Sequence, residues 1–125
     1  MSFSITNTTG EKLPDFDYEA MKIAALGRKY ELSFVISSVE EICKLNLIYR
    51  NIDRATDILS FPLSKDSGEI HLCLSEARRE SKNFKREYEN FIAFLFIHGC
   101  AHLKGHDHSA RMEEFERTIR EKFRI

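Results

Sequence analysis

The segment that most constrains the fold of this chain is residues 88–103, its most apolar stretch with helical spacing. Phe91, Phe94 and Leu95 recur at the intervals that bring side chains to one face of a helix. Gly105 follows shortly after, and glycine commonly ends a helix because it adopts the left-handed conformation without strain. We therefore predict a rigid, buried helix over residues 88–103.

The rest of the chain is made of short segments with strand or helix character. β-Branched or alternating apolar residues predict strands over residues 3–5, 30–36, 56–61 and 69–74. Helical spacing predicts helices over residues 15–29, 38–49 and 112–123, with a further one from residue 76. The length of 125 residues suits one domain. The predicted fold class is α+β, a small mixed β-sheet packed with helices in a single domain over residues 1–125.

Three local signals predict where these elements begin and end. Ser38 followed by Glu41 has the spacing of a capping box, in which each side chain satisfies a backbone N–H of the other residue. Ser75 is a candidate cap for a helix that begins at Glu76. Pro62 is expected to stop the strand over residues 56–61, because proline has no N–H to donate to a neighbouring strand.

The cysteines and the charge balance bear on the protein's environment. Cys43, Cys73 and Cys100 are odd in number and widely spaced, which favours reduced thiols in a cytoplasmic protein. We expect no secretory signal and no membrane span, because the longest near-apolar stretch, residues 91–97, is far below the ~20 residues that a span needs. A net charge of −1 excludes nucleic-acid binding through a global positive field and leaves only a local cleft.

Four of the five histidines lie between residues 98 and 108. His98 and His102 are four residues apart, so a helix presents both imidazoles on one face, at a spacing that lets them bind one metal ion. Gly105 can end that helix and let the chain turn back, so that His108 supplies a third nitrogen. Three protein ligands leave the fourth position of tetrahedral zinc open for water, which is typical of a catalytic site. The sequence thus predicts one catalytic Zn²⁺ per chain.

Several alternatives stay open around this cluster. His106 can replace His108 as the third ligand, and Asp107 can hold the second N–H of a ligating histidine. Imidazole also accepts nickel and other divalent transition metals. Gly99 occupies the position at which zinc peptidases carry a glutamate base, which argues against ordinary peptide hydrolysis. A glycine there allows either close helix packing or the approach of a bulky group such as a phosphate.

Three sequence blocks resemble the YbeY family of metal-dependent endoribonucleases and rRNA maturation factors. Residues 98–108 match the family pattern H-G-x-x-H-L-x-G-x-D-H. Residues 45–62 are similar to its N-x-x-Y/F-R-x-x-D-x-x-T-D-V-L-S-F-P block, and residues 68–70 are similar to its G-D-I strand entry. The three blocks keep their order and spacing, and the resemblance spans nearly the whole chain.

The resemblance implies a specific set of site residues. It implies that His98, His102 and His108 bind zinc, and that Arg50 is the basic residue required for RNA cleavage, so the catalytic set is Arg50, His98 and His102. Arg50 and Ser60 are the residues expected to bind the substrate. Arginine suits this role because its guanidinium grips a phosphate bidentately and stabilises charge in the transition state. Without the resemblance, the sequence predicts Arg50 to be a solvated residue near the end of a helix.

The function implied by the resemblance is cleavage of single-stranded RNA in small-subunit rRNA 3′-end maturation and ribosome quality control. Implied partners are rRNA and the ribosome, its proteins or a GTPase. A zinc hydrolase of another class stays open, because the histidine spacing also resembles that of metzincin peptidases and predicts a zincin-like metal-binding helix. A non-catalytic ribosome-assembly factor with a structural metal also stays open. Further basic candidates for a local RNA groove are Arg54, Lys82, Lys85 and Arg86.

Overall fold

The computed structural model describes residues 2–105 and 109–125, and its centre is a mixed β-sheet. In the described ranges the sheet has four strands in the order β1-β2-β4-β3. β1 pairs with β2 and β2 with β4 in parallel, whereas β3 and β4 form an antiparallel hairpin. The strands are β1 (Phe3–Asn7), β2 (Glu31–Ile36), β3 (Ile58–Ser64) and β4 (Ser67–Leu72). The predicted α+β class with a mixed sheet is confirmed.

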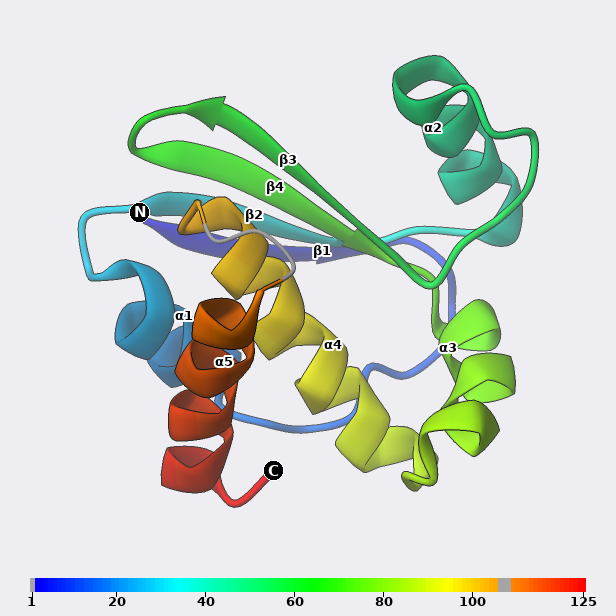
Figure 1. Ribbon diagram of the computed structural model, residues 1–125. Helices are drawn as coiled ribbons and strands as arrows, with labels where there is room; N and C mark the ends of the chain where they lie inside the picture. Colours follow the sequence, from blue (N-terminus) through cyan, green and yellow to red (C-terminus); the bar gives the residue numbers. More distant parts are fainter. Residues whose placement is uncertain (1, 106–108) are drawn as a thin grey trace.

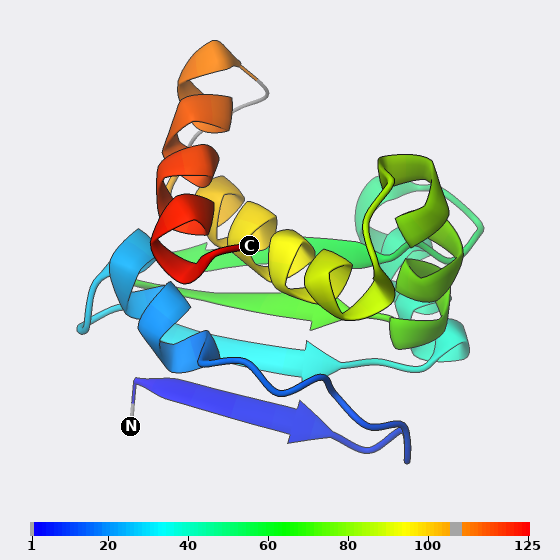
Figure 2. The same cartoon turned by 90° about the horizontal axis from the view of Figure 1, so that it is seen from below.

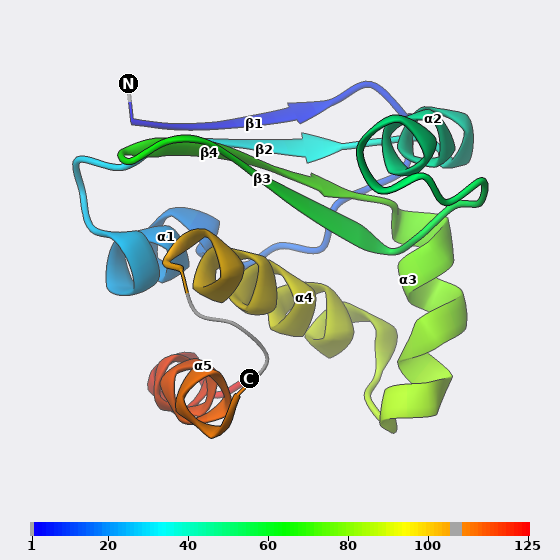
Figure 3. The same cartoon turned by 45° about the horizontal axis from the view of Figure 1, so that its top comes forward.

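The helices lie on both sides of this sheet. α1, α4 and α5 lie over one face, and α2 lies on the other side near the end of the sheet (Figures 1 and 2). α3 and a short 3₁₀ helix, η1, connect β4 to α4 at that end (Figure 3). The helices are α1 (Tyr18–Leu26), α2 (Val39–Arg50), α3 (Leu74–Glu80), η1 (Ser81–Phe84), α4 (Tyr88–Leu103) and α5 (Ala110–Phe123).

α4 is the central helix of the core, as its apolar sequence predicts. Its side chains Phe91, Phe96 and Cys100 are completely buried. The ring of Phe96 packs 4.6 Å from that of Phe34 in β2 and 5.2 Å from that of Tyr18 in α1, measured between centroids. α4 therefore holds its polar side chains on a rigid support, which fixes their geometry better than a loop would.

Most predicted helix ends are where the sequence places them. α4 covers residues 88–103, and Gly105 adopts a left-handed φ of 99° just beyond it. The capping box at α2 is present, because Ser38 accepts from Glu41 N while the Glu41 side chain accepts from Ser38 N. α1 is shorter than the predicted residues 15–29: it begins at Tyr18, because Asp17 caps it by accepting from Ala20 N, and it ends at Leu26, because Gly27 adopts a φ of 90°.

Two boundary signals from single residues are also wrong. Pro62 does not end a strand, because β3 continues through it to Ser64 and pairs it with Gly68. The sheet tolerates this proline because β3 is an edge strand and its register shifts between Pro62 and Ser64. Ser75 does not cap a helix; α3 already begins at Leu74, and β4 ends at Leu72.

Two further predictions concern cysteines and membrane spans. Cys43, Cys73 and Cys100 are free thiols, as their number and spacing predict. Within the described ranges, no helix has the length and apolar character needed to cross a bilayer.

Candidate functional site

His98 and His102 converge on one side of α4, as their spacing predicts. The two Nε2 atoms are 3.1 Å apart, and the imidazole rings are nearly perpendicular, at 88°. Two imidazole nitrogens bound to one zinc ion at a tetrahedral angle would stand about 3.3 Å apart, given Zn–N bonds of about 2.0–2.1 Å. The pair therefore has the separation that a shared metal ion requires.

Glu116 of α5 contacts the Nδ1 atom of the His98 imidazole. Its Oε1 and Oε2 atoms lie 3.1 and 3.0 Å from His98 Nδ1, and the carboxylate is only 3% exposed. An ionised carboxylate only accepts, so the proton of His98 resides on Nδ1. The lone pair on Nε2 then points toward His102, where it can accept from His102 or bind a metal ion. This carboxylate–histidine pairing is the usual support of a metal-ligating imidazole.

Arg120 balances the buried charge of Glu116. Its Nη1 atom lies 3.7 Å from Glu116 Oε1, and its Nη2 atom donates to Glu113 Oε1 at 3.1 Å. The guanidinium also lies 5.3 Å from the ring centroid of Phe94, whose ring is parallel to that of His98 within 3°. A charged network thus fixes Glu116, and through it His98, on the side away from His102.

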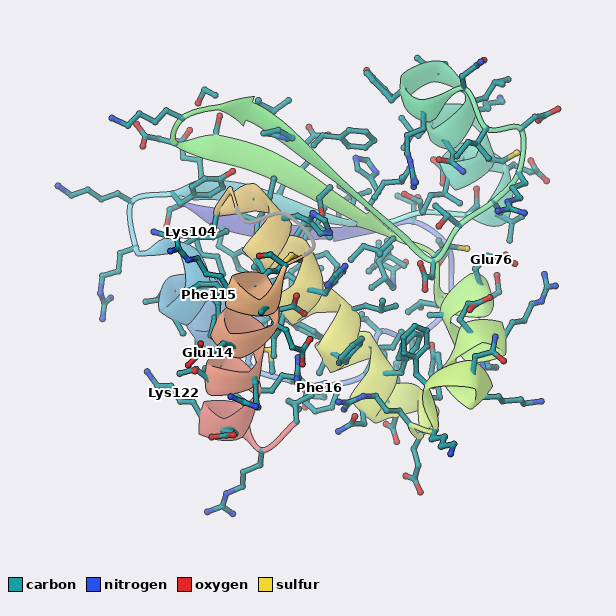
Figure 4. The ribbon with its side chains drawn as sticks, in the orientation of Figure 1. Phe16, Glu76, Lys104, Glu114, Phe115 and Lys122 are labelled. Atoms are coloured by element: carbon teal, nitrogen blue, oxygen red, sulfur yellow. The ribbon has the colours of Figure 1, made fainter. Side chains whose placement is uncertain are left out.

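The prediction from sequence missed Glu116, although a signal for it exists. Met112, Glu116 and Ile119 follow helical spacing and are all buried. The exposed side of the same helix carries charged side chains such as Glu114 and Lys122 (Figure 4). An acidic residue in an otherwise apolar stripe needs a buried partner, because an unpaired buried charge is costly. Here the partners are His98, which donates to the carboxylate, and Arg120, which balances its charge.

The third predicted ligand lies outside the described residues. His108, like His106 and Asp107, lies in residues 106–108, which the structure does not describe. The roles of these three residues therefore stay predictions. Within residues 2–105 and 109–125, no group of three or more histidine, cysteine or acidic side chains is arranged around one point. The donor set that is described, two converging imidazoles with one backed by a carboxylate, nevertheless fits a divalent transition metal.

A cleft of about 660 Å³ opens beside the two histidines. Arg50, the last residue of α2, also lines this cleft and is solvent-exposed, so a basic residue borders the same space as the two histidines. The tertiary structure thereby brings together the predicted residues Arg50, Ser60, His98 and His102. The remaining lining residues are Tyr49, Thr56, Asp57, Ile58, Leu59, Phe61, Pro62 and Leu103.

Ser60 and Gly99 form the contact between β3 and α4. The Ser60 hydroxyl donates to Gly99 O at 3.3 Å, so it ties the strand to the helix besides lining the cleft. A Cβ atom at Gly99 would lie 3.0 Å from Ile70 Cδ1 and 3.1 Å from both Ile58 Cδ1 and Ser60 Oγ. Close packing against the sheet therefore explains the glycine at this position.

Asp57 is a second cleft residue that the prediction from sequence missed. It lines the cleft beside Arg50 and also an adjoining cavity of about 610 Å³ that Phe84 and Glu116 line. Burial raises the pKa of its carboxyl, and the negative charge of Glu80 adds to the rise, whereas a hydrogen bond from the Ile58 backbone opposes it. A carboxyl group with a raised pKa in a cleft is a candidate for proton transfer.

The other basic candidates do not line the cleft beside the histidines. Arg54, Lys82 and Lys85 are exposed elsewhere on the surface. The guanidinium of Arg86 lies 4.3 Å from the ring centroid of Phe94 and contacts Asn90, so it packs against α4. Among the five basic side chains predicted from sequence, Arg50 is the one that the structure brings to this cleft.

Comparisons with known proteins agree with the resemblance seen in the sequence. Residues 5–124 match the family model described as "Endoribonuclease YbeY". A protein of that name from Sulfurimonas denitrificans is 35% identical over 111 residues, covering 83% of this chain and 80% of the relative. A second protein of that name, from Clostridioides difficile, is 33% identical over 123 residues, covering 90% of this chain and 79% of the relative. The solution structure of TM1509 from Thermotoga maritima superposes with a TM-score of 0.66 at 27% identity, covering 98% and 91% of the two chains.

Proposed function

Because this chain belongs to the YbeY family of endoribonucleases, we propose that it hydrolyses single-stranded RNA in a zinc-dependent reaction at the cleft between α4, β3 and the end of α2. One observation carries the assignment of the site. One cleft is lined by the converging histidines His98 and His102 and by Arg50. A metal-binding pair next to a phosphate-binding cation suits cleavage of a phosphodiester.

The metal ligands in this proposal are His98, His102 and His108. Zinc, when bound, supplies a Lewis acid that polarises a phosphoryl oxygen. Glu116 keeps His98 in the tautomer whose Nε2 carries the lone pair, and it fixes the plane of the ring. The identity of the metal rests on the chemistry of imidazole ligands, and nickel or another divalent transition metal satisfies the same donor set.

Arg50 and Asp57 have the other two roles in this proposal, phosphate binding and proton transfer. Arg50 binds the phosphate through two N–H groups, which neutralises charge and orients the scissile bond. Asp57 accepts or donates a proton at the cleft, a role that its raised pKa supports. Gly99 occupies the position of the glutamate base of zinc peptidases, and a Cβ atom there would lie 3.0 Å from Ile70 Cδ1, so this neighbour would have to shift. The absence of that glutamate argues against ordinary peptide hydrolysis.

The biological substrate in this proposal is ribosomal RNA, at the 3′ end of the small-subunit rRNA, with a role in ribosome quality control. Membership of the family supports this assignment, together with the place of Arg50 in the cleft beside the histidines. Ribosomal proteins or a GTPase would bring the protein to that RNA. A ribosome-assembly role without catalysis is separated from this proposal by the cleavage assay below.

Removal of the metal tests the proposal directly. Wild-type protein is assayed for metal content and for cleavage of a single-stranded RNA and of its duplex form. Chelation followed by desalting is expected to abolish cleavage of the single strand, and about one equivalent of zinc per chain is expected to restore it. Restoration by nickel or manganese is compared in parallel. Cleavage that continues unchanged in metal-free protein would refute a metal-dependent site.

Glu116→Gln is expected to weaken zinc binding by roughly 10- to 100-fold, because the neutral amide supports the His98 imidazole less strongly than a carboxylate does. Competition with a chromogenic chelator measures the affinity. Glu114→Gln is the matched control, because it removes the same charge from the exposed side of the same helix. Equal zinc affinities for the two variants would show that Glu116 does not support a metal ligand.

A further inference from the structure

Tyr49 presents an exposed aromatic ring at the mouth of the cleft. Tyr49 is 64% exposed, although it lines the same cleft as His98 and His102. Arg50 is the next residue in the chain and lines the same cleft, so the proposed phosphate-binding residue and Tyr49 border one space at the end of α2. An exposed aromatic side chain at a cleft lacks the burial that usually stabilises such a residue.

The ring of Tyr49 is supported from one side. Phe61 of β3 packs against it with a centroid separation of 4.8 Å and an interplanar angle of 52°. Phe61 in turn contacts the ring of His71 at 5.6 Å, and His71 is held by Glu69 at 3.0 Å and Ser37 at 3.1 Å. This row of contacts restrains one side of the Tyr49 ring and leaves much of its surface open to solvent. The ring is therefore a preorganised flat surface.

We propose that Tyr49 stacks against one nucleobase of the RNA substrate, adjacent to the phosphate that Arg50 binds. Proteins that hold single-stranded nucleic acids stack bases on exposed aromatic rings next to cationic groups that bind the backbone. The bases of a duplex are already stacked on their neighbours, so this contact selects unpaired RNA. The inference rests on the proposed function of the cleft and assigns to Tyr49 its preference for single strands.

A protein partner is the alternative to RNA as the ligand of the surface formed by the end of α2 and β3. Leu47, Ile48 and Leu63 are also exposed apolar side chains near the end of α2 and on β3. None of these three lines the cleft, whereas Tyr49 does. The position of Tyr49 between Phe61 and Arg50 therefore favours the nucleobase. Ile48, which is 71% exposed, provides a matched apolar control from the adjacent position in the chain.

Binding to metal-free protein tests the stacking contact without cleavage. Fluorescence anisotropy with a labelled single-stranded RNA octamer compares wild type with Tyr49→Ala, Tyr49→Phe and Ile48→Ala. Tyr49→Ala is expected to raise Kd by roughly 5- to 150-fold, the usual range for loss of one stacked base. Tyr49→Phe, which keeps the ring, and Ile48→Ala are expected to bind as wild type does. Thermal denaturation of each variant checks that the fold is retained.

An abasic scan distinguishes stacking from a general structural effect. The octamer is synthesised with one base removed at each position in turn. Wild type is expected to lose affinity most at one position, and Tyr49→Ala is expected to lose nothing further there, because the contact is already absent. A change in the fold would instead lower affinity for every oligonucleotide equally.

Either of two results would overturn the inference. One is a Kd for Tyr49→Ala equal to that of wild type. The other is an equal loss in Tyr49→Ala and Ile48→Ala with no dependence on the abasic position, which would show that the loss reflects the surface at the end of α2 and not a stacked base. Cleavage of RNA by the zinc-loaded wild type is scored separately. Binding without cleavage would count against the proposed function, and cleavage without an effect of Tyr49→Ala on binding would count against the stacking contact alone.

Discussion

His98→Ala is expected to lower kcat/KM for single-stranded RNA by about 10³-fold or more, because it removes a metal ligand and with it the Lewis acid of the reaction. The Nε2 atom of His98 lies 3.1 Å from that of His102, so the substitution removes one of the two imidazoles that converge on this point. Metal content per chain is expected to fall together with activity. His102→Ala is expected to behave in the same way.

The same substitution has a second, structural effect. Glu116 is 3% exposed, and its hydrogen bond to His98 Nδ1 disappears in His98→Ala, which leaves Arg120 as the described cation beside a buried carboxylate. Loss of a partner for a buried charged group costs about 1–3 kcal/mol or more in unfolding free energy. The double variant His98→Ala/Glu116→Gln should recover part of this loss of stability and none of the activity. Undiminished cleavage with unchanged metal content in His98→Ala would refute the site.

Arg50→Ala is expected to lower kcat/KM by about 10²- to 10³-fold, the usual effect of removing one group that stabilises charge in a transition state. Its metal content should equal that of wild type, because Arg50 lies on α2 and the histidines on α4. Its stability should change little, because the side chain is exposed. Arg50→Lys should recover only part of the activity, because an ammonium group does not form the bidentate contact.

Arg54→Ala is the matched control for this prediction. Arg54 is an exposed arginine four residues further along the chain, and it does not line the cleft. Equal activities of Arg50→Ala and Arg54→Ala would assign any loss to net charge and not to the cleft. Preserved metal content in Arg50→Ala, set against its loss in His98→Ala, separates the phosphate-binding group from the metal ligands.

Local sequence signals predicted the elements whose geometry depends on neighbours along the chain. The extent of α4 and the left-handed Gly105 follow from an apolar run closed by a helix-breaking residue. The cap of α2 at Ser38 follows from the spacing of two residues. Predictions failed where a distant strand decided the outcome. Pro62 continues β3 because that strand has a neighbour on one side only, which the sequence of β3 itself does not reveal.

The candidate site also combines features that local sequence predicts with features that depend on contacts between distant segments. The sequence by itself determined that His98 and His102 share one face, because the period of a helix is a local property of the backbone. Only the tertiary structure placed Glu116 behind His98, since that pairing depends on how α5 packs against α4. It also brought Arg50 and Tyr49 to the histidines, because the antiparallel pairing of β3 with β4 and the position of α2 decide which residues line the cleft. Contacts between distant segments depend on the packing of the whole core, which no short pattern encodes.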